Sequence, residues 1–219
     1  MTIYDEIDII RNNAAIQIFE KLCKYDSEVL PIDFQSVGIT LHSIIGTNNS
    51  NQILSVLKNI SLPSEFSLDY THFISESFGQ YDVVVTDSSG NKDKNIFNYL
   101  TVDKSKMGAW QAYLLFSLWH TLPLNDHSNY SSRKFIYSSK DITSLYIKED
   151  NIRSKCFKSN IDIKVVGLRD FFYISCCYWC HFSGLNRIIC EMQFRDNKII
   201  NINEVSRINL VEYGRDIRL

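Results

Sequence analysis

The segment Phe171-Phe-Tyr-Ile-Ser-Cys-Cys-Tyr-Trp-Cys-His-Phe182 decides how the C-terminal half of this 219-residue chain is expected to fold. It is followed by Ser183-Gly184 and by a second apolar run, Leu185 to Phe194. Aromatic residues favour strands, and a Ser-Gly pair between two such runs favours a tight turn. The pattern therefore predicts an antiparallel β-hairpin with both faces covered.

The same segment contains a C-x-x-C motif, Cys177 to Cys180, followed by His181, a pattern found in zinc and thiol redox sites. Side chains alternate along a strand, so Cys177 and Cys180 are expected to point to opposite faces. They could then bind one ion or form a disulfide only if a bulge intervened. We interpret them as buried structural thiols, with no metal and no cofactor, and keep metal and redox chemistry as minority alternatives.

The alternation divides the side chains of this strand into two sets. One set is expected to face a buried central helix, and it comprises Phe172, Ile174, Cys176, Tyr178, Cys180 and Phe182. The other set either faces outward as a protein-binding patch or forms a second core layer under the N-terminal helices. This second set comprises Tyr173, Ser175, Cys177, Trp179 and His181. The candidate partner-binding residues are three of its members and three rim residues: Tyr173, Trp179, His181, Asn186, Arg187 and Glu191.

Helices are expected before this hairpin. Apolar residues at spacings of three and four predict an amphipathic helix from Thr2 to Tyr25, with the stripe Ile3, Ile7, Ile10, Ala14, Ile18 and Leu22, widened by Ala15 and Phe19. A shorter helix is expected from Asn51 to Ile60, capped by Ser50. Lys106 to Leu122 is apolar on nearly every side, with Ser105 as its cap, and is expected to be the buried central helix.

Strands are expected around the hairpin. Tyr81 to Thr86 and Arg133 to Ser138 resemble strands, a short helix is expected over 139–147, and Ile96 to Val102 is open between strand and helix. From Ile161 onward the pattern is all strand, with Asp196-Asn197 as a type I′ turn between the hairpin and further strands at 198–205 and 207–213. The predicted fold class is α+β: N-terminal helices and a buried central helix packed on a C-terminal antiparallel β-meander. We expect a single domain over 1–219, helix-rich over 1–122, with the antiparallel sheet at about 133–213.

Composition restricts the class of protein. The hydrophobic share of 45% and charged share of 22% are typical of a globular domain, and a net charge of −2 gives no general attraction to nucleic acid or to an anionic membrane. The longest apolar run, Met107 to Leu122, is interrupted by polar residues and is short for a bilayer span. The first residues are acidic where a secretory signal would be basic. We expect a cytoplasmic protein with reduced cysteines and with neither nucleic-acid nor membrane partners.

A possible catalytic group follows the expected central helix. His120, Asp126 and His127 lie close together in the sequence, and a His–Asp pair at a helix end could act as a general acid/base couple in a small hydrolase. No G-x-S-x-G or H-E-x-x-H motif accompanies them. The other interpretation is a capped helix end. We leave the question of an enzyme open and favour a protein without catalytic activity.

Several short motifs in the C-terminal half share a pattern with known proteins. They are Met107-Gly-Ala-Trp-Gln-Ala-Tyr-Leu-Leu115, Leu118 to Leu124, Asn129-Tyr130, and Cys176-Cys-Tyr-Trp179 with Gly184-Leu185 and Arg187. They resemble a group of small, uncharacterised Bacteroides-type bacterial proteins that accompany secreted antibacterial toxins as immunity proteins. Where that group ends in a Tyr-Asp-Cys-Gly pattern, this chain has Tyr213-Gly214-Arg215-Asp216. The resemblance implies a cytosolic binding protein that neutralises a cognate protein toxin in a stoichiometric complex, and it assigns a role to no single residue.

Overall fold

The computed structural model describes the backbone of residues 3–26, 35–38, 53–74, 79–121, 134–181 and 183–214. Its side chains are described over 10–26, 35–38, 53–69, 84–117, 134–181 and 183–214. The chain divides into two compact units: unit 1 comprises 1–30, 134–193 and 201–219, and unit 2 comprises 31–133 and 194–200. Within the described ranges, no helix combines the length and the apolar character that crossing a bilayer requires.

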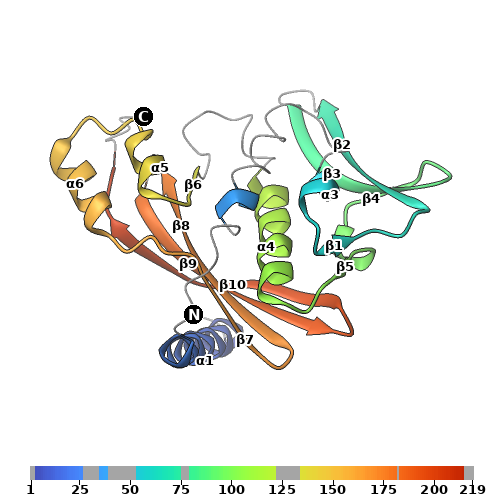
Figure 1. Ribbon diagram of the computed structural model, residues 1–219, viewed down its shortest axis with the longest axis horizontal. Coiled ribbons are helices and arrows are strands. Elements are labelled where there is room, and N and C mark those ends of the chain that lie inside the picture. The colour runs from blue at the N-terminus through green and yellow to red at the C-terminus, as the bar shows by residue number, and fades with distance from the viewer. Residues whose placement is uncertain are drawn as a thin grey trace. The chain divides into compact units, whose positions relative to one another are not determined.

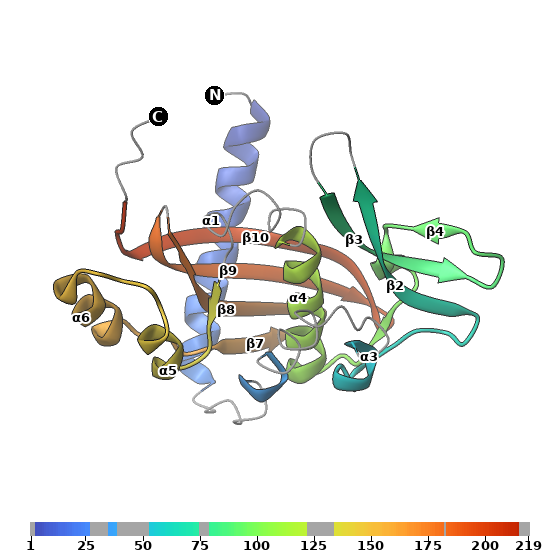
Figure 2. The same cartoon turned by 90° about the horizontal axis from the view of Figure 1, so that it is seen from above.

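The sheet of unit 1 is antiparallel and is built around the predicted hairpin (Figures 1 and 2). Strand β8, Phe171–Cys180, pairs along its whole length with β9, Gly184–Arg195, in a register that places Tyr173 opposite Glu191. The other edge of β8 pairs with two short strands, β7 and β6, which are Lys164–Leu168 and Lys134–Ile136. Strand β10, Lys198–Val211, lies beside β9. The α+β class and the C-terminal antiparallel meander are confirmed, although the two strands expected at 198–205 and 207–213 are one continuous strand.

The two turns expected in this meander are present. Asp196 and Asn197 both have positive φ angles, +47° and +61°, as the two central residues of a type I′ turn require. Gly184 begins β9 with φ of +84°, and a Cβ atom there would lie 2.0 Å from the carbonyl oxygen of Val211. Only glycine fits this position, because any other residue would meet both the unfavourable backbone angle and the neighbouring chain.

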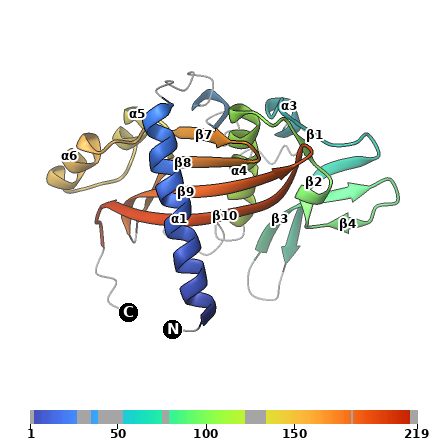
Figure 3. The ribbon, with the colours of Figure 1, turned by 90° about the horizontal axis from the view of Figure 1, so that it is seen from below.

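Helix α1, Ile3–Tyr25, lies across strands β7 to β10 of the same sheet (Figure 3). Ala15 and Phe19 are buried in a cluster with four residues of the sheet: Val166, Tyr173, Ile189 and Val205. Ile10, by contrast, is 69% exposed. The prediction that the whole apolar stripe is buried is therefore wrong at this residue. Figure 3 shows the N-terminal part of α1 extending past β10.

Two short helices of unit 1 lie between β6 and β7 in the sequence. Helix α5, Ser139–Thr143, begins with a capping box in which the backbone N–H of Ser138 donates to the Asp141 carboxylate at 2.8 Å. Helix α6, Asp150–Lys158, was not expected from the sequence. Its residues are mostly polar and only Cys156 is fully buried, so it lacks the apolar stripe by which a helix is recognised.

Unit 2 contains the remaining helices and two small sheets. Helix α4, Lys106–Thr121, matches the predicted buried helix, and the Ser105 hydroxyl accepts from the Gly108 N–H at 3.0 Å, as the expected cap should. The side chains from Ala109 to Leu115 are buried. One sheet has the order β2-β3-β4 and the other pairs β1 with β5; their bounds are Phe66–Ile74, Gly79–Asp87 and Lys92–Asp93, and Ile60–Ser61 with Thr101–Val102.

Three sequence-based expectations in unit 2 need correction. Strand β2 was not predicted. Helix α3 is shorter than expected, Ile53–Val56, because Ile60 already belongs to strand β1. The ambiguous segment 96–102 contains both alternatives, a 3-10 helix, η2, at Ile96–Asn98 and then strand β5.

Candidate functional site

The face of β8 that carries Tyr173 and Trp179 is covered along the described part of the strand. Tyr173 is 2% exposed and Trp179 is 1% exposed. Of the two interpretations that the sequence left open, the outward aromatic patch is therefore wrong, and the second core layer is correct. The covering elements differ along the strand, because α1 packs at the Tyr173 end and the α5–α6 segment packs at the Trp179 end.

The Trp179 end of this face is a closed apolar core. The Trp179 ring contacts Tyr213 with ring centroids 5.0 Å apart and meets His181 edge-on at 6.2 Å. Among the described residues, nothing accepts a hydrogen bond from the indole Nε1. The cluster around Trp179 is completed by aliphatic residues and cysteines: Ile136, Ile142, Leu145, Ile147, Cys156, Cys177, Leu185 and Val211.

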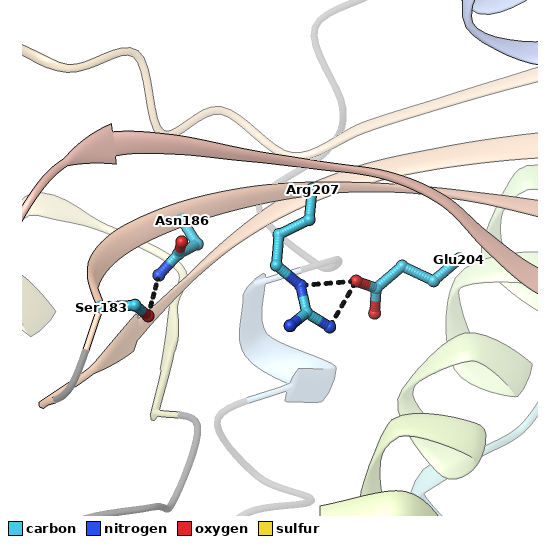
Figure 4. A network of polar contacts seen from close by, with 4 residues as sticks. All are labelled: Ser183, Asn186, Glu204 and Arg207. Atoms are coloured by element: carbon cyan, nitrogen blue, oxygen red, sulfur yellow. Dashed lines mark hydrogen bonds and ion pairs between the residues drawn. The ribbon is translucent and has the colours of Figure 1, made fainter. Parts of the chain in front are cut away.

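Asn186 and Arg187, expected to rim a binding patch, hold parts of unit 1 together. The Asn186 side-chain amide donates to Ser183 Oγ at 2.9 Å and to the Gly184 carbonyl at 2.8 Å, which closes the β8–β9 turn (Figure 4). The Arg187 guanidinium donates to the backbone carbonyl and side chain of Asn160, in the loop before β7. Asn186 is buried, whereas Arg187 and His181 are partly exposed.

Figure 4 also shows an ion pair on β10 between Glu204 and Arg207, with Oε1–Nη2 and Oε1–Nε distances of 2.6 and 2.8 Å. The Arg207 side chain is 48% exposed and that of Glu204 is 29% exposed, and the pair lies outside the pocket described next.

The Tyr173 end of the face is covered by α1 but borders a pocket. A pocket of about 690 Å³ lies between α1 and the β7–β8 turn, and we call it the α1–turn pocket. Its lining comes from α1, from the turn and from strands β8 and β9: Arg11, Ala14, Ala15, Ile18, Leu168, Arg169, Asp170, Phe171, Tyr173, Glu191 and Gln193. Its volume is that of a site for a small molecule or for one or two side chains of a partner.

Glu191 is the buried charge of this pocket. It is 7% exposed and lies directly across the strand pair from Tyr173. The Arg11 guanidinium on α1 is 3.6 Å from Glu191 Oε1 and is half exposed. A carboxylate this deeply buried needs a cation nearby, because removing it from water without one costs several kcal/mol. Burial first, and then the charge of Glu191, raise the pKa of the Tyr173 phenol.

Arg169, on the rim of the pocket, has an unusual backbone conformation. Its φ angle is +54°, in the left-handed region that favours glycine. The other non-glycine residues with positive φ in the described chain are Asp196 and Asn197, which tolerate this region well. A residue held in a costly backbone conformation at the edge of a pocket is a feature that binding sites share.

The catalytic candidates of the sequence lie mostly beyond the described part of the chain. His120 belongs to α4, but its side chain is outside the described residues. Asp126 and His127 are outside them altogether. The hydrolase alternative therefore stays a prediction.

The cysteines are arranged as the alternation predicts. Cys177 pairs with Ile136 and packs in the Trp179 cluster, whereas Cys180 lies on the other face of β8, and all six cysteines are free. Burial raises the pKa of the Cys177 thiol, which keeps it protonated and unreactive at neutral pH. In the described ranges, no three His, Cys, Asp or Glu side chains are grouped as a metal site would require.

Sequence reasoning named two residues of the α1–turn pocket, Tyr173 and Glu191, but not the pocket. One feature of the sequence could have pointed to it: Glu191 is the one acidic residue of the strand Gly184–Arg195 and stands between apolar neighbours, and buried glutamates are rare unless paired. Arg11 and Arg169 could not have been found, because neither stands out in its own segment. Comparisons with protein-family models, with curated proteins and with solved structures found no match to this chain.

Proposed function

We propose that this chain is a non-enzymatic binding protein that captures a partner protein at the α1–turn pocket, and that the partner is an antibacterial toxin which the chain neutralises as an immunity protein. The observation that carries the proposal is Glu191, a buried and paired carboxylate at an open, largely apolar pocket. Apolar walls with a few fixed polar groups are the composition of a binding site.

The state of the polar groups favours binding over catalysis. Burial first, and then the charge of Glu191, raise the pKa of the Tyr173 phenol, which keeps it in its protonated form. A general base needs a pKa near the working pH, and a phenol with a raised pKa does not meet that condition. Glu191 pairs with Arg11. These groups are therefore arranged to hold a charge in place.

Rigid support and strain favour the same role. Glu191 and Tyr173 belong to the paired strands β8 and β9, which hold the pocket floor in one geometry. Arg169 keeps a positive φ where glycine would be less costly. A binding surface that is already in its bound geometry loses less conformational entropy on association.

The toxin as partner is supported by the resemblance of the segments from Met107 onward to Bacteroides-type immunity proteins. A net charge of −2 would assist association with a basic toxin only slightly. The chain would act in the cytoplasm, where a toxin that enters the cell has to be intercepted.

The proposal is tested by expressing each protein encoded beside this gene in a bacterial host, with and without this chain. We expect one of them to stop growth, the chain to restore growth, and the two proteins to elute together in a 1:1 complex in size-exclusion chromatography. A neighbouring toxin that kills equally with and without the chain would contradict the proposal.

A variant shows whether the pocket is the surface used. Leu168→Asp places a charge on the exposed apolar wall and should lower the affinity for the partner by about tenfold or more. Ile208→Asp is the matched control, because Ile208 is equally exposed but lies on β10, outside the pocket lining. Equal binding by both variants would place the partner elsewhere on the chain.

A further inference from the structure

We propose that the partner inserts a lysine or arginine side chain into the α1–turn pocket, where this cation replaces Arg11 as the ion-pair partner of Glu191. The inference rests on the proposed binding function and adds the chemistry of the group that is bound. It is carried by the different exposure of the two charges: the side chain of Glu191 is 9% exposed, whereas that of Arg11 is 50% exposed.

The fixed charge of the pocket is negative. Glu191 projects from a paired strand, directly opposite the buried Tyr173. Charges interact more strongly where water is excluded, so the buried carboxylate determines which charge the floor of the pocket favours. The side chain of Arg11 is 50% exposed and Arg169 is exposed, so water and salt screen the charges of these two lining arginines.

Arg11 occupies this site loosely. Its Nη2 atom is 3.6 Å from Glu191 Oε1, beyond a hydrogen bond of ordinary length. A long side chain on the exposed part of α1 can turn into solvent and be hydrated there at little cost. An incoming cation would keep Glu191 paired, so the exchange leaves no buried charge without a partner.

The walls of the pocket suit the stem of such a side chain. Ile18, Leu168 and Phe171 line it. Lysine and arginine bury their methylene groups against apolar surfaces while their charged ends reach a polar partner. The gain in affinity comes from this buried stem and from a closer ion pair than the one that Arg11 makes.

An anionic group would be bound less well. It would have to approach the buried Glu191 carboxylate, and like charges at short range in a poorly solvated site repel strongly. An uncharged apolar group could enter but would leave the Arg11–Glu191 pair as it is. The charge of the ligand therefore distinguishes the three possibilities.

The experiment uses the full chain and four peptides, acetyl-Leu-Xaa-Leu-amide with Xaa as arginine, lysine, norleucine or glutamate. Binding is followed by the NMR shifts of the backbone amides of Leu168, Phe171 and Glu191. We expect the arginine and lysine peptides to bind about tenfold more tightly than the norleucine peptide, and the glutamate peptide to bind least. Equal binding of all four, preference for glutamate, or no binding of any peptide would overturn the inference.

Three variants locate the preference. Glu191→Gln keeps the shape of the side chain and should remove the preference for arginine over norleucine. Glu204→Gln is the matched control, because it removes a carboxylate paired with an arginine outside the pocket, and should leave the preference unchanged. Arg11→Gln should tighten binding of the arginine peptide several-fold, since the competing cation is gone; weaker binding would contradict the exchange. If Arg11→Gln does not fold, the peptide series with the wild type and with Glu191→Gln still tests the inference.

The outcome can be separated from that of the proposed function. A chain that restores growth against its toxin but shows no cation preference in the peptide series would retain the binding role and lose this inference. A chain that prefers the cationic peptides but binds no toxin would lose the immunity role and keep the site. With the toxin in hand, Glu191→Gln should weaken the complex about tenfold or more, and Glu204→Gln should not.

Discussion

The two ends of one sheet face in unit 1 are covered in different ways. At one end, Trp179 is enclosed by aliphatic residues and by Tyr213, with Cys177 beside it. At the other, Tyr173 packs under α1 but borders a pocket that contains the buried charge of Glu191. Both ends belong to strand β8, and its side chains alternate in the same way at both. The difference arises from the elements that cover them, the α5–α6 segment over Trp179 and α1 over Tyr173.

The two ends are expected to differ in role, the Trp179 end in stability and the Tyr173 end in binding. The Trp179 end is closed, so its apolar surface contributes to folding. The Tyr173 end leaves apolar surface and a paired charge accessible to a partner, and it holds Arg169 in a costly backbone conformation. We therefore expect substitutions at the first end to affect mainly the free energy of unfolding, and substitutions at the second to affect binding as well.

The largest effect is expected at the closed end. Trp179→Ala should lower the free energy of unfolding by about 3–5 kcal/mol, because it leaves a large cavity among residues that cannot collapse into it. The measurement is urea unfolding followed by far-UV circular dichroism. Trp179→Phe is the control and should cost less than half as much, since no described residue accepts from the indole Nε1 and only ring volume is lost. A loss below about 1 kcal/mol for Trp179→Ala would show that this end is not a closed core.

An intermediate effect is expected at Tyr173. Tyr173→Phe removes a buried hydroxyl that lies opposite the buried Glu191 carboxylate, and should lower the free energy of unfolding by about 1–2 kcal/mol at neutral pH. The raised pKa of the folded phenol adds a pH dependence. Near pH 10 the unfolded chain releases this proton while the folded chain keeps it, so stability is full below that pH and falls above it.

The test compares how steeply the free energy of unfolding decreases with pH above about pH 10. In the wild type, each phenol that ionises only on unfolding should contribute a loss of about 1.4 kcal/mol per pH unit above its unfolded pKa. Tyr173→Phe should fall less steeply by that amount. Tyr137→Phe serves as a control for a buried tyrosine away from the pocket, because burial also raises the pKa of Tyr137. Equal slopes for the wild type and Tyr173→Phe would mean that the pKa of the folded phenol is not raised.

The smallest effect is expected at the rim of the pocket. Arg169→Gly should raise the free energy of unfolding by up to about 1 kcal/mol, because glycine adopts positive φ without the steric cost that arginine has there. Arg169→Ala removes the same charge but keeps the unfavourable angle, so it should bring no such gain. Thermal and urea unfolding of the two variants side by side make the comparison. If Arg169→Gly is the less stable of the two, no strain is stored at this turn.

The parts of unit 1 that follow from short-range rules could be predicted from the sequence. Alternation placed Cys177 and Cys180 on opposite faces, and the Asp196-Asn197 pair indicated the type I′ turn. The segments that were missed lack such patterns. Helix α6 is mostly polar, and β10 is one long strand where the sequence pattern predicted two.

The α1–turn pocket was beyond prediction for a different reason. It requires Arg11 and Ile18 of α1 to meet the turn at Leu168–Phe171 and Glu191 of β9, three segments far apart in the sequence. Each segment taken alone is compatible with many neighbours. The prediction that Tyr173 and Trp179 are exposed was wrong for the same reason. No pattern within β8 indicates which helix covers it.

By itself, the sequence determined which side chains of β8 and β9 share a face, where the chain turns, and that two cysteines spaced as a C-x-x-C motif point apart. These are consequences of backbone geometry over a few residues. Only the tertiary structure decided that one end of the face is closed over Trp179 and that the other leaves Glu191 in a pocket with Arg11. Packing joins segments that are distant in the chain, and the free energy of burying a charge depends on all of the groups that surround it.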